Sequence, residues 1–467
     1  MAESAQPVSS HPGYIAARQI AETLRGAGHQ AYLAGGCVRD LLLGLAPKDY
    51  DVATSATPDA VLALFPDKKA FTVGAHFGVV LICESDDVST EVATFRHDGA
   101  YSDGRRPDAV RFSSDPREDV LRRDFTINGM LLDTALYDRT ADAAQATLDY
   151  VGGRNDLATR TIRAIGNPIE RFAEDKLRML RAVRFAARLG FSIEPATAEA
   201  IRTLASEITV VSPERIRDEL TLILTEGGAR RGFELLDQLN LLPYILPEIN
   251  KLHGVQQPPE YHPEGDVWIH TMLLLEKLPA GASPALAWGA LLHDVGKPAT
   301  FRPPDPAIPT DRIRFNGHVE VGVRIAEILL SRLRFSNEES AQIVALVKNH
   351  MRFGDVKHMR ESTLKRFLRL PHFDEHLALH RIDCLSSHGD LSLYEFAKQK
   401  YESVPVAEIR PQLLLTGREL IAAGYNPGPG FKKMLEAAED AQLEGTISNQ
   451  IEALHFIRER FGAPHQS

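Results

Sequence analysis

The hydrophobic pattern of this 467-residue chain changes near residue 149, and that change restricts the possible folds more than any other feature. Before it, short apolar runs rich in β-branched and aromatic residues alternate with helical segments and glycine turns, which predicts a small α/β domain with a mixed sheet. After it, almost every segment has the apolar spacing of an amphipathic helix. The chain is also too long for one core, at about 150 residues per domain. We therefore expect an α/β head followed by an all-helical body in several parts.

This pattern defines the individual elements that we expect. In the first part, turn-bounded runs predict strands at residues 31–34, 50–53, 71–73, 79–83 and 90–95. Helical spacing in that part predicts helices at residues 14–24 and 38–43. In the second part the clearest predicted helices are residues 175–189, 197–204, 214–224, 267–278, 284–292, 319–333 and 338–347.

Composition excludes several classes of protein. Hydrophobic residues at 44% and charged residues at 25% exclude a disordered protein, a collagen and a disulfide scaffold. The longest apolar runs, such as residues 285–292, are far shorter than the ~20 residues that span a bilayer, and we expect no signal peptide and no membrane association. The widely separated Cys37, Cys83 and Cys384 predict a reduced, cytoplasmic protein. Because the formal net charge is -10, any RNA binding requires locally clustered positive groups.

A glycine turn precedes a pair of aspartates in the head. Gly35 and Gly36 lie between a predicted strand and a predicted helix, where exposed backbone N–H groups form a seat for phosphate. Asp49 and Asp51 follow; two residues apart on a strand, their carboxylates would project from one face. Such carboxylates repel each other unless a cation lies between them, and hard oxygen ligands suit Mg²⁺. Taken alone, the pair also fits a solvated loop with two surface acids.

Two later segments carry further polar groups that suit a nucleotide. Residues 122–128 combine Arg123, Asp124 and Asn128, where arginine can clamp phosphate and the other two can bond sugar hydroxyls. Residues 174–184 place four charged residues three positions apart along one helix face: Asp175, Arg178, Arg181 and Arg184. The alternative is an exposed ladder of ion pairs. Because a separate apolar face supplies the core and the three arginines lack a matching set of acids nearby, we expect this face to bind an anion.

In this order, these motifs resemble the class II tRNA nucleotidyltransferase and bacterial poly(A) polymerase family, within the DNA-polymerase-beta-like nucleotidyltransferase superfamily. The resemblance covers residues 31–224 and includes Gly152-Gly153, Asp156-Leu157 and residues 212–215. It departs at Gly129, where the family usually has alanine.

The resemblance implies roles for the head residues. Asp49 and Asp51 would hold two Mg²⁺ ions, with Glu91 as a third carboxylate unless it is a surface acid. The turn at Gly35 and Gly36, with Arg39, would contact the triphosphate of CTP or ATP. The implied ribose-binding residues are Arg123, Asp124 and, in support, Asn128. The implied base-reading residues are Asp175 and Arg178, supported by Arg181 and Arg184.

The arginine-rich segment at residues 96–107 is either an ordinary surface loop or the specificity loop of the family. In CCA-adding members a flexible loop here helps to change specificity from CTP to ATP. Its presence makes an enzyme that adds only CC the weaker expectation, and leaves CCA addition and terminal A addition both open.

A second group of polar residues lies in the helical part. An apolar helix at residues 284–292 ends in adjacent His293 and Asp294, and such buried polar groups need a partner or a cation. With the following glycine and lysine, this resembles the HD phosphohydrolase superfamily, which implies a divalent transition metal or Mg²⁺ and action on phosphoesters. The implied ligands are His270, His293, Asp294, His318, His350 and Asp383.

The expected fold is multidomain α/β plus all-α: a DNA-polymerase-beta-like nucleotidyltransferase head with a small mixed sheet, then an elongated all-helical neck, an HD domain and a tail. The expected parts are a tail at residues 1–12, a head at 13–158, a base-reading neck at 159–225, an HD domain at 226–398 and a tRNA-binding region at 399–467. The resemblance implies addition of CCA, or its terminal A, to tRNA. The alternatives are a poly(A) polymerase and, from another class, an HD phosphohydrolase whose head binds RNA.

Overall fold

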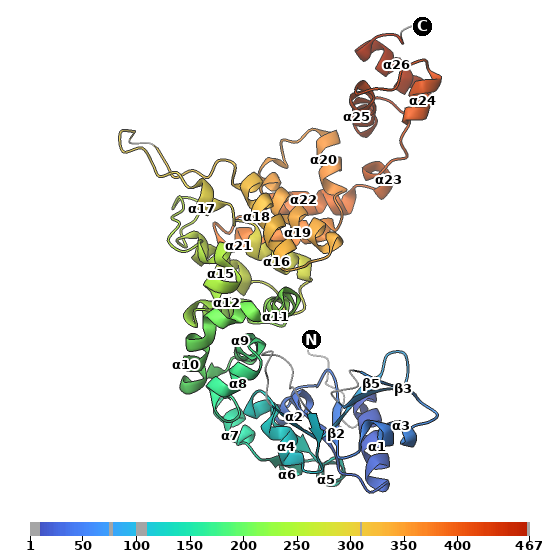
Figure 1. Cartoon of the computed structure of the whole chain (residues 1–467). Coiled ribbons are helices and arrows are strands. Elements are labelled where there is room, and N and C mark those ends of the chain that lie inside the picture. The colour runs from blue at the N-terminus through green and yellow to red at the C-terminus, as the bar shows by residue number, and fades with distance from the viewer. Residues whose placement is uncertain (1–9, 74–77, 100–109, 309–310, 465–467) are drawn as a thin grey trace. The chain divides into compact units, whose positions relative to one another are not determined.

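A computed structural model describes residues 10–73, 78–99, 110–308 and 311–464 of the chain (Figure 1). The chain divides into two compact units, Met1–Pro247 and Glu248–Ser467. The five predicted parts are finer than this division, and their boundaries stay predictions. Among the described residues no helix has both the length and the apolar character needed to cross a membrane.

The first unit is built around a seven-stranded sheet with the order β3-β4-β5-β2-β1-β8-β9. β2 and β5 are parallel and the other neighbouring strands are antiparallel, so the predicted mixed sheet is confirmed. The strands are β1 (Ala31–Ala34), β2 (Asp51–Thr54), β3 (Lys69–Thr72), β4 (Val79–Cys83), β5 (Ser89–Thr94), β8 (Met130–Leu132) and β9 (Thr147–Asp149). β8 and β9 have only three residues each, too few to show an alternating pattern, and the sequence does not predict them.

Helix α1 (Pro12–Gly26) packs on β1, β2 and β5 and buries Tyr14, Ala17, Ile20 and Leu24, which recur at helical spacing. The other helices of the head are α2 (Gly36–Leu42), α3 (Pro58–Leu64), α4 (Pro116–Leu121), η3 (Thr126–Asn128), α5 (Thr134–Thr140), α6 (Ala143–Ala146) and α7 (Gly153–Ala158). β6 (Arg96–Asp98) pairs antiparallel with β7 (Val110–Phe112). The rest of the predicted specificity loop, residues 100–107, lies outside the described residues.

The remainder of the first unit is largely helical, but the expectation of an all-helical neck was wrong, because two short strands pair within it. Its helices are α8 (Pro168–Glu174), α9 (Leu177–Leu189), α10 (Pro195–Leu204), η4 (Ala205–Val210), α11 (Pro213–Thr225), α12 (Ala229–Gln238) and α13 (Leu242–Ile245), and β10 (Thr161–Ile162) pairs with β11 (Ser192–Ile193). α9 packs against both α11 and α12 through a buried face that includes Leu180 and Val183. The helix predicted from residue 175 begins two residues later, because Asp175 has extended backbone angles.

The second unit consists mainly of helices around the buried helix α16 (Pro284–Leu292), which packs against α15 (Val267–Glu276), α19 (Asn337–Asn349) and α21 (Phe373–Ser386). The other helices are α14 (Pro247–Asn250), α17 (Lys297–Thr300), α18 (His318–Arg332), η5 (His350–Asp355), α20 (Glu361–Leu368), α22 (Ser392–Ser403), α23 (Val406–Ile409), α24 (Gly417–Ala422), α25 (Gly430–Leu443) and α26 (Gln450–Phe461). The last three form their own small core around Leu420, Ala453 and Ile457.

Candidate active site

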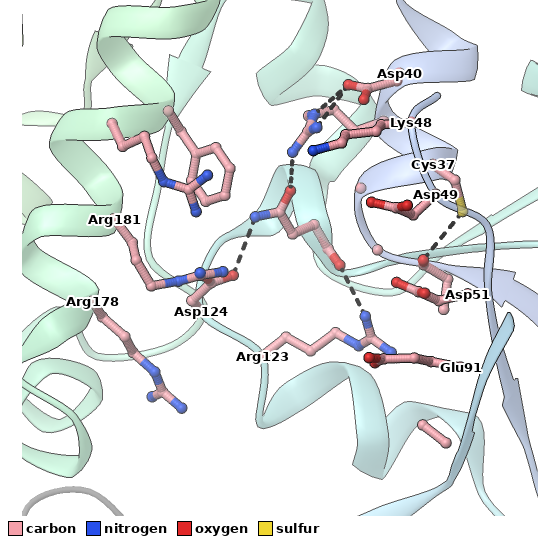
Figure 2. A pocket seen from close by; sticks show the side chains of 18 of the residues that line it. Cys37, Asp40, Lys48, Asp49, Asp51, Glu91, Arg123, Asp124, Arg178 and Arg181 are labelled. Carbon is pink, nitrogen blue, oxygen red and sulfur yellow. Dashed lines mark hydrogen bonds and ion pairs between the residues drawn. The ribbon is translucent and has the colours of Figure 1, made fainter. Parts of the chain in front are cut away.

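A polar cavity of about 570 Å³ opens at the sheet of the first unit, between the ends of its strands and helix α9 (Figure 2). Every residue to which the sequence assigned a catalytic or nucleotide-binding role in the first unit lines it: Gly35, Gly36, Arg39, Asp49, Asp51, Glu91, Arg123, Asp124, Asn128, Asp175, Arg178, Arg181 and Arg184. The structure thus brings these residues together, while the roles implied for them stay predictions.

Three carboxylates gather at one side of this cavity. Asp51 is the first residue of β2, and Glu91 lies on the neighbouring parallel strand β5 (Figure 2). Val52 pairs with Val92, and Asp51 and Glu91 each come one residue before a member of this pair. The expectation that Asp49 and Asp51 share a strand was wrong, because Asp49 lies in the loop before β2; both nevertheless line the cavity. Burial, and then the charge of Glu91, raise the pKa of Asp51 to about 6. An all-oxygen donor set whose members disfavour one another's charge fits a hard divalent cation.

The glycine turn lies beside these acids. Gly35 has a φ of 79°, in the left-handed region, and a Cβ there would lie 3.1 Å from Nη1 of Arg123. A residue with a side chain would therefore strain the turn and crowd the arginine. Gly35 is thus suited to a sharp strand-to-helix turn that keeps the backbone open to the cavity.

The arginines near this turn are held by neighbouring acids and amides. Arg39 donates to Asp40 at 2.7 Å and to Oδ1 of Asn128 at 2.8 Å, and Asn128 in turn donates to Asp124 at 3.3 Å. Arg123 donates at 3.0 Å to the buried Asp119. Bonds of this kind fix a guanidinium in one orientation before a ligand arrives.

Acids also pair with the arginines of α9, and here the sequence interpretation was wrong. Arg181 bonds Asp124 at 2.8 Å, Arg178 bonds Glu174 at 2.6 Å, and Arg184 bonds Glu219 at 2.8 Å. Counting acids near the helix misses two of these partners, because they come from distant parts of the chain. Acids therefore already balance the charge of these three arginines, so the arginines by themselves do not require an anionic ligand. What still favours such a ligand is that all three arginines line the cavity.

Several cavity residues carried no predicted role. Lys48 is exposed, directly precedes Asp49, and has no carboxylate within ion-pair distance in the part of the chain that the structure describes (Figure 2). Phe185 presents its ring to three guanidinium groups, with that of Arg184 nearest at 4.6 Å from the ring centroid. The signal for Lys48 was its place beside the aspartate pair, whereas nothing in the sequence distinguishes Phe185 from a core aromatic residue.

The second unit brings the predicted histidines and aspartates together in one cluster. They come from α15, the end of α16, the start of α18, the start of η5 and α21: His270, His293, Asp294, His318, His350 and Asp383. The two carboxylate oxygens of Asp294 face different histidines. Oδ2 lies 3.1 Å from His293, whereas Oδ1 lies 3.8 Å from both His318 and His350.

The Nδ1 atoms fix the orientation of these rings. Nδ1 of His293, His318 and His350 lies 2.7–2.9 Å from a backbone carbonyl oxygen, which can only accept, so Nδ1 carries the proton. Each Nε2 is thereby left as a lone-pair donor toward Asp294, which is how histidines are prepared for a metal ion. Burial lowers the pKa of His350 to about 4, which also favours the neutral ring.

Glu264 is a part of this cluster that sequence reasoning missed. Its Oε1 lies 2.7 Å from Nδ1 of His270 and 2.9 Å from Nδ1 of His262. Although burial opposes it, hydrogen bonds to Asp383 and Glu264 raise the pKa of His270 to about 9. The only sequence signal was an acid six residues before a predicted ligand.

Comparison with known proteins places the chain in a family. Three family models match in order: the poly(A) polymerase head domain at residues 31–163, a region described as an RNA- and SrmB-binding site of polymerase A at 190–252, and tRNA nucleotidyltransferase domain 2 at 319–457. The CCA-adding enzyme of Oceanobacillus iheyensis is 42% identical over 228 residues, 49% of this chain and 54% of that enzyme. That of Bacillus cereus strain Q1 is 29% identical over 94% of this chain and 96% of its own length.

Solved structures agree with this result. The Bacillus stearothermophilus CCA-adding enzyme in complex with CTP matches with a TM-score of 0.70 and 26% identity, over 97% of this chain and 98% of that one. The Thermotoga maritima CCA-adding enzyme complexed with tRNA has the same fold, with a TM-score of 0.57 and 18% identity over 98% of each chain. The fold and its acidic cavity thus define a nucleotidyltransferase. The chain belongs to the family of tRNA nucleotidyltransferases and poly(A) polymerases.

Proposed function

We propose that this protein adds CCA to the 3′ ends of tRNA, taking CTP and ATP as substrates and using no nucleic-acid template. The observation that carries the proposal is the single cavity that joins the three carboxylates to Asp175 and Arg178. The relatives support it, since relatives matched over nearly their whole length are CCA-adding enzymes, and one structure of such an enzyme is a complex with CTP. The chain is related to poly(A) polymerases at the level of the family only, through the match of its head to the poly(A) polymerase head domain.

In this proposal the carboxylates of Asp49, Asp51 and Glu91 would hold two Mg²⁺ ions. The ions would supply positive charge for the α-phosphate and the attacking 3′-hydroxyl. The glycine turn receives the triphosphate, and the exposed Lys48 adds a positive charge beside it. Asp124 and Asn128, already fixed by their bonds to arginines, offer acceptors and a donor to the ribose hydroxyls.

The base would be selected by Asp175 and Arg178. Cytosine and adenine each present an amino donor beside a ring-nitrogen acceptor, whereas uracil and guanine present a carbonyl oxygen where the amino group stands. A carboxylate can accept from the amino group, and a guanidinium can donate to the ring nitrogen. Both triphosphates can therefore be read by the same two side chains.

The proposal is tested with tRNA transcripts that end before CCA, after one C and after CC, supplied with labelled CTP and ATP separately and together. We expect addition to stop once CCA is complete. Addition of A alone, and only to the CC end, would replace the proposal with terminal A addition. Long A tails on unrelated RNA would replace it with polyadenylation.

We also propose a cytoplasmic location, which the three unpaired cysteines support, two of them buried in the fold.

A second activity is favoured by the cluster around Asp294, which we propose binds divalent metal and hydrolyses phosphoesters. Asp294 would hold the metal together with His293, His318 and His350, which surround its two oxygens, and the metal would supply positive charge to a bound phosphoester. The cluster borders a cavity of about 790 Å³ lined by His318, His350 and Asp383, so a small ligand has access to it. Metal content of the purified protein and hydrolysis of bis-p-nitrophenyl phosphate test this; no bound metal after loading with Mn²⁺, Co²⁺ or Ni²⁺ would contradict it.

A further inference from the structure

Asp175, the carboxylate proposed to read the base, is held by an arginine that lies behind it. Arg215, on α11, donates through Nη2 to Oδ2 of Asp175 at 2.7 Å and through Nη1 to Oδ1 at 3.2 Å. This is the two-bonded arrangement that fixes a carboxylate in both position and rotation. The Asp175 and Arg215 side chains are 17% and 23% exposed, so the pair is largely shielded from water. Asp175 lines the cavity, and Arg215 is absent from its lining.

The remaining bonding capacity of Asp175 is small. An ionised carboxylate offers about four acceptor positions. Arg215 occupies one on each oxygen, and the backbone N–H of Leu177 donates to Oδ1 at 3.0 Å, which also caps the start of α9. One position on Oδ2 is then left for a ligand. Because the carboxylate cannot rotate without breaking these bonds, that position accepts from one direction only.

We infer that Arg215 is a positioning residue for nucleotide selection: by fixing Asp175 it leaves a single acceptor that admits an amino group and rejects a carbonyl oxygen. This inference rests on the proposed function. An amino donor at that point, from cytosine or adenine, completes the bonding of the carboxylate. A carbonyl oxygen of uracil or guanine would place acceptor against acceptor and leave both unpaired in a shielded site.

The arginine acts only through the aspartate, so the two should be coupled. Without Arg215 the carboxylate can turn away from a carbonyl oxygen, and the penalty against UTP and GTP falls. Misplacement by about 1 Å at a reacting site can change rates about 100-fold, so we expect the selectivity to fall by about 10- to 100-fold. The kcat/KM for CTP and ATP should fall less than the selectivity does.

The test measures kcat/KM for CTP and UTP on tRNA ending before CCA, and for ATP and GTP on tRNA ending in CC. The variants are Arg215→Ala, Arg215→Lys, Asp175→Asn and the double variant Arg215→Ala with Asp175→Asn. Arg202→Ala is the matched control, because Arg202 forms an exposed ion pair with Glu199 on α10. Thermal unfolding of each variant is recorded, and if Arg215→Ala does not fold, Arg215→Lys carries the comparison.

We expect Arg215→Ala to lose selectivity, Arg215→Lys to restore part of it, and the double variant to be no less selective than Asp175→Asn alone. Equal losses for all four nucleotides would overturn the inference, since that is the result of a purely structural role. Independent, multiplying losses of selectivity in the double variant would overturn it as well. Failure of the wild-type protein to add any nucleotide would overturn the proposed function itself, a result distinct from an active wild type whose selectivity survives Arg215→Ala.

Discussion

Replacing Asp51 with asparagine should abolish nucleotide addition and at the same time stabilise the metal-free protein. Burial and the neighbouring Glu91 raise the pKa of Asp51 to about 6, about two pKa units above its ordinary value. Each pKa unit corresponds to about 1.4 kcal/mol, so the ionised carboxylate costs the fold about 3 kcal/mol. Asparagine has nearly the same shape without the charge, and it removes this cost.

The sign of the pH dependence follows from the direction of the shift. Because the pKa is higher in the folded than in the unfolded state, the cost is present in full above about pH 6 and disappears below about pH 4. The wild-type protein should therefore unfold about 6–12 °C below Asp51→Asn at pH 8, at about 2–4 °C per kcal/mol for a unit of this size. At pH 4 the two proteins should unfold at similar temperatures.

The assay is thermal unfolding of the two proteins in EDTA at pH 8, 6 and 4, repeated with excess Mg²⁺. Mg²⁺ should stabilise the wild type, by about 2.7 kcal/mol at a hundred times its dissociation constant, and leave Asp51→Asn unchanged. Asp67→Asn is the matched control, since Asp67 is exposed and should shift stability by less than about 0.5 kcal/mol. A wild type as stable as Asp51→Asn at pH 8 in EDTA, or a difference independent of pH, would show that the ionised Asp51 does not destabilise the fold.

Three other predictions concern the two sites. Asp49→Ala should lower nucleotide addition by about 1,000-fold or more, the effect of losing several kcal/mol of charge stabilisation, while tRNA affinity in a filter-binding assay stays unchanged; near-normal addition would contradict the metal assignment. Arg178→Ala should lower selectivity for CTP over UTP by about tenfold, the value of one hydrogen bond to a charged group, and unchanged selectivity in single-turnover assays would place base reading elsewhere. His318→Ala should lower the divalent metal content of the protein, measured by mass spectrometry, and leave nucleotide addition unchanged; a fall in addition by a folded variant would mean that the sites depend on each other.

The sequence predicts well what depends on neighbouring residues. The strand at residues 31–34 and the turn at Gly35 follow from a short apolar run and two glycines, although α2 begins two residues before the predicted position. The apolar spacing of residues 284–292 predicts α16 with its observed bounds. In both places the local sequence pattern and the tertiary packing favour the same structure, so the local pattern is enough to predict the element.

Ion pairs between residues that lie far apart in the sequence could not be predicted. The arginines of α9 lack a full set of acids nearby, yet Arg181 pairs with Asp124, 57 positions earlier, and Arg184 with Glu219, 35 positions later. The bond between Arg215 and Asp175 joins residues 40 positions apart in the same way. No spacing rule relates such residues, because their contact is set by how the helices pack. The positions lining the site were therefore predicted, and the bonds that hold them were not.

The most direct test of the account is the sequence that the protein adds to one tRNA transcript lacking CCA when all four nucleoside triphosphates are present. We expect C, C and A in that order, followed by a stop, with no U or G and no extension of an unstructured RNA of equal length. A run of A residues on both RNAs, or a product with U or G in place of C or A, would contradict it.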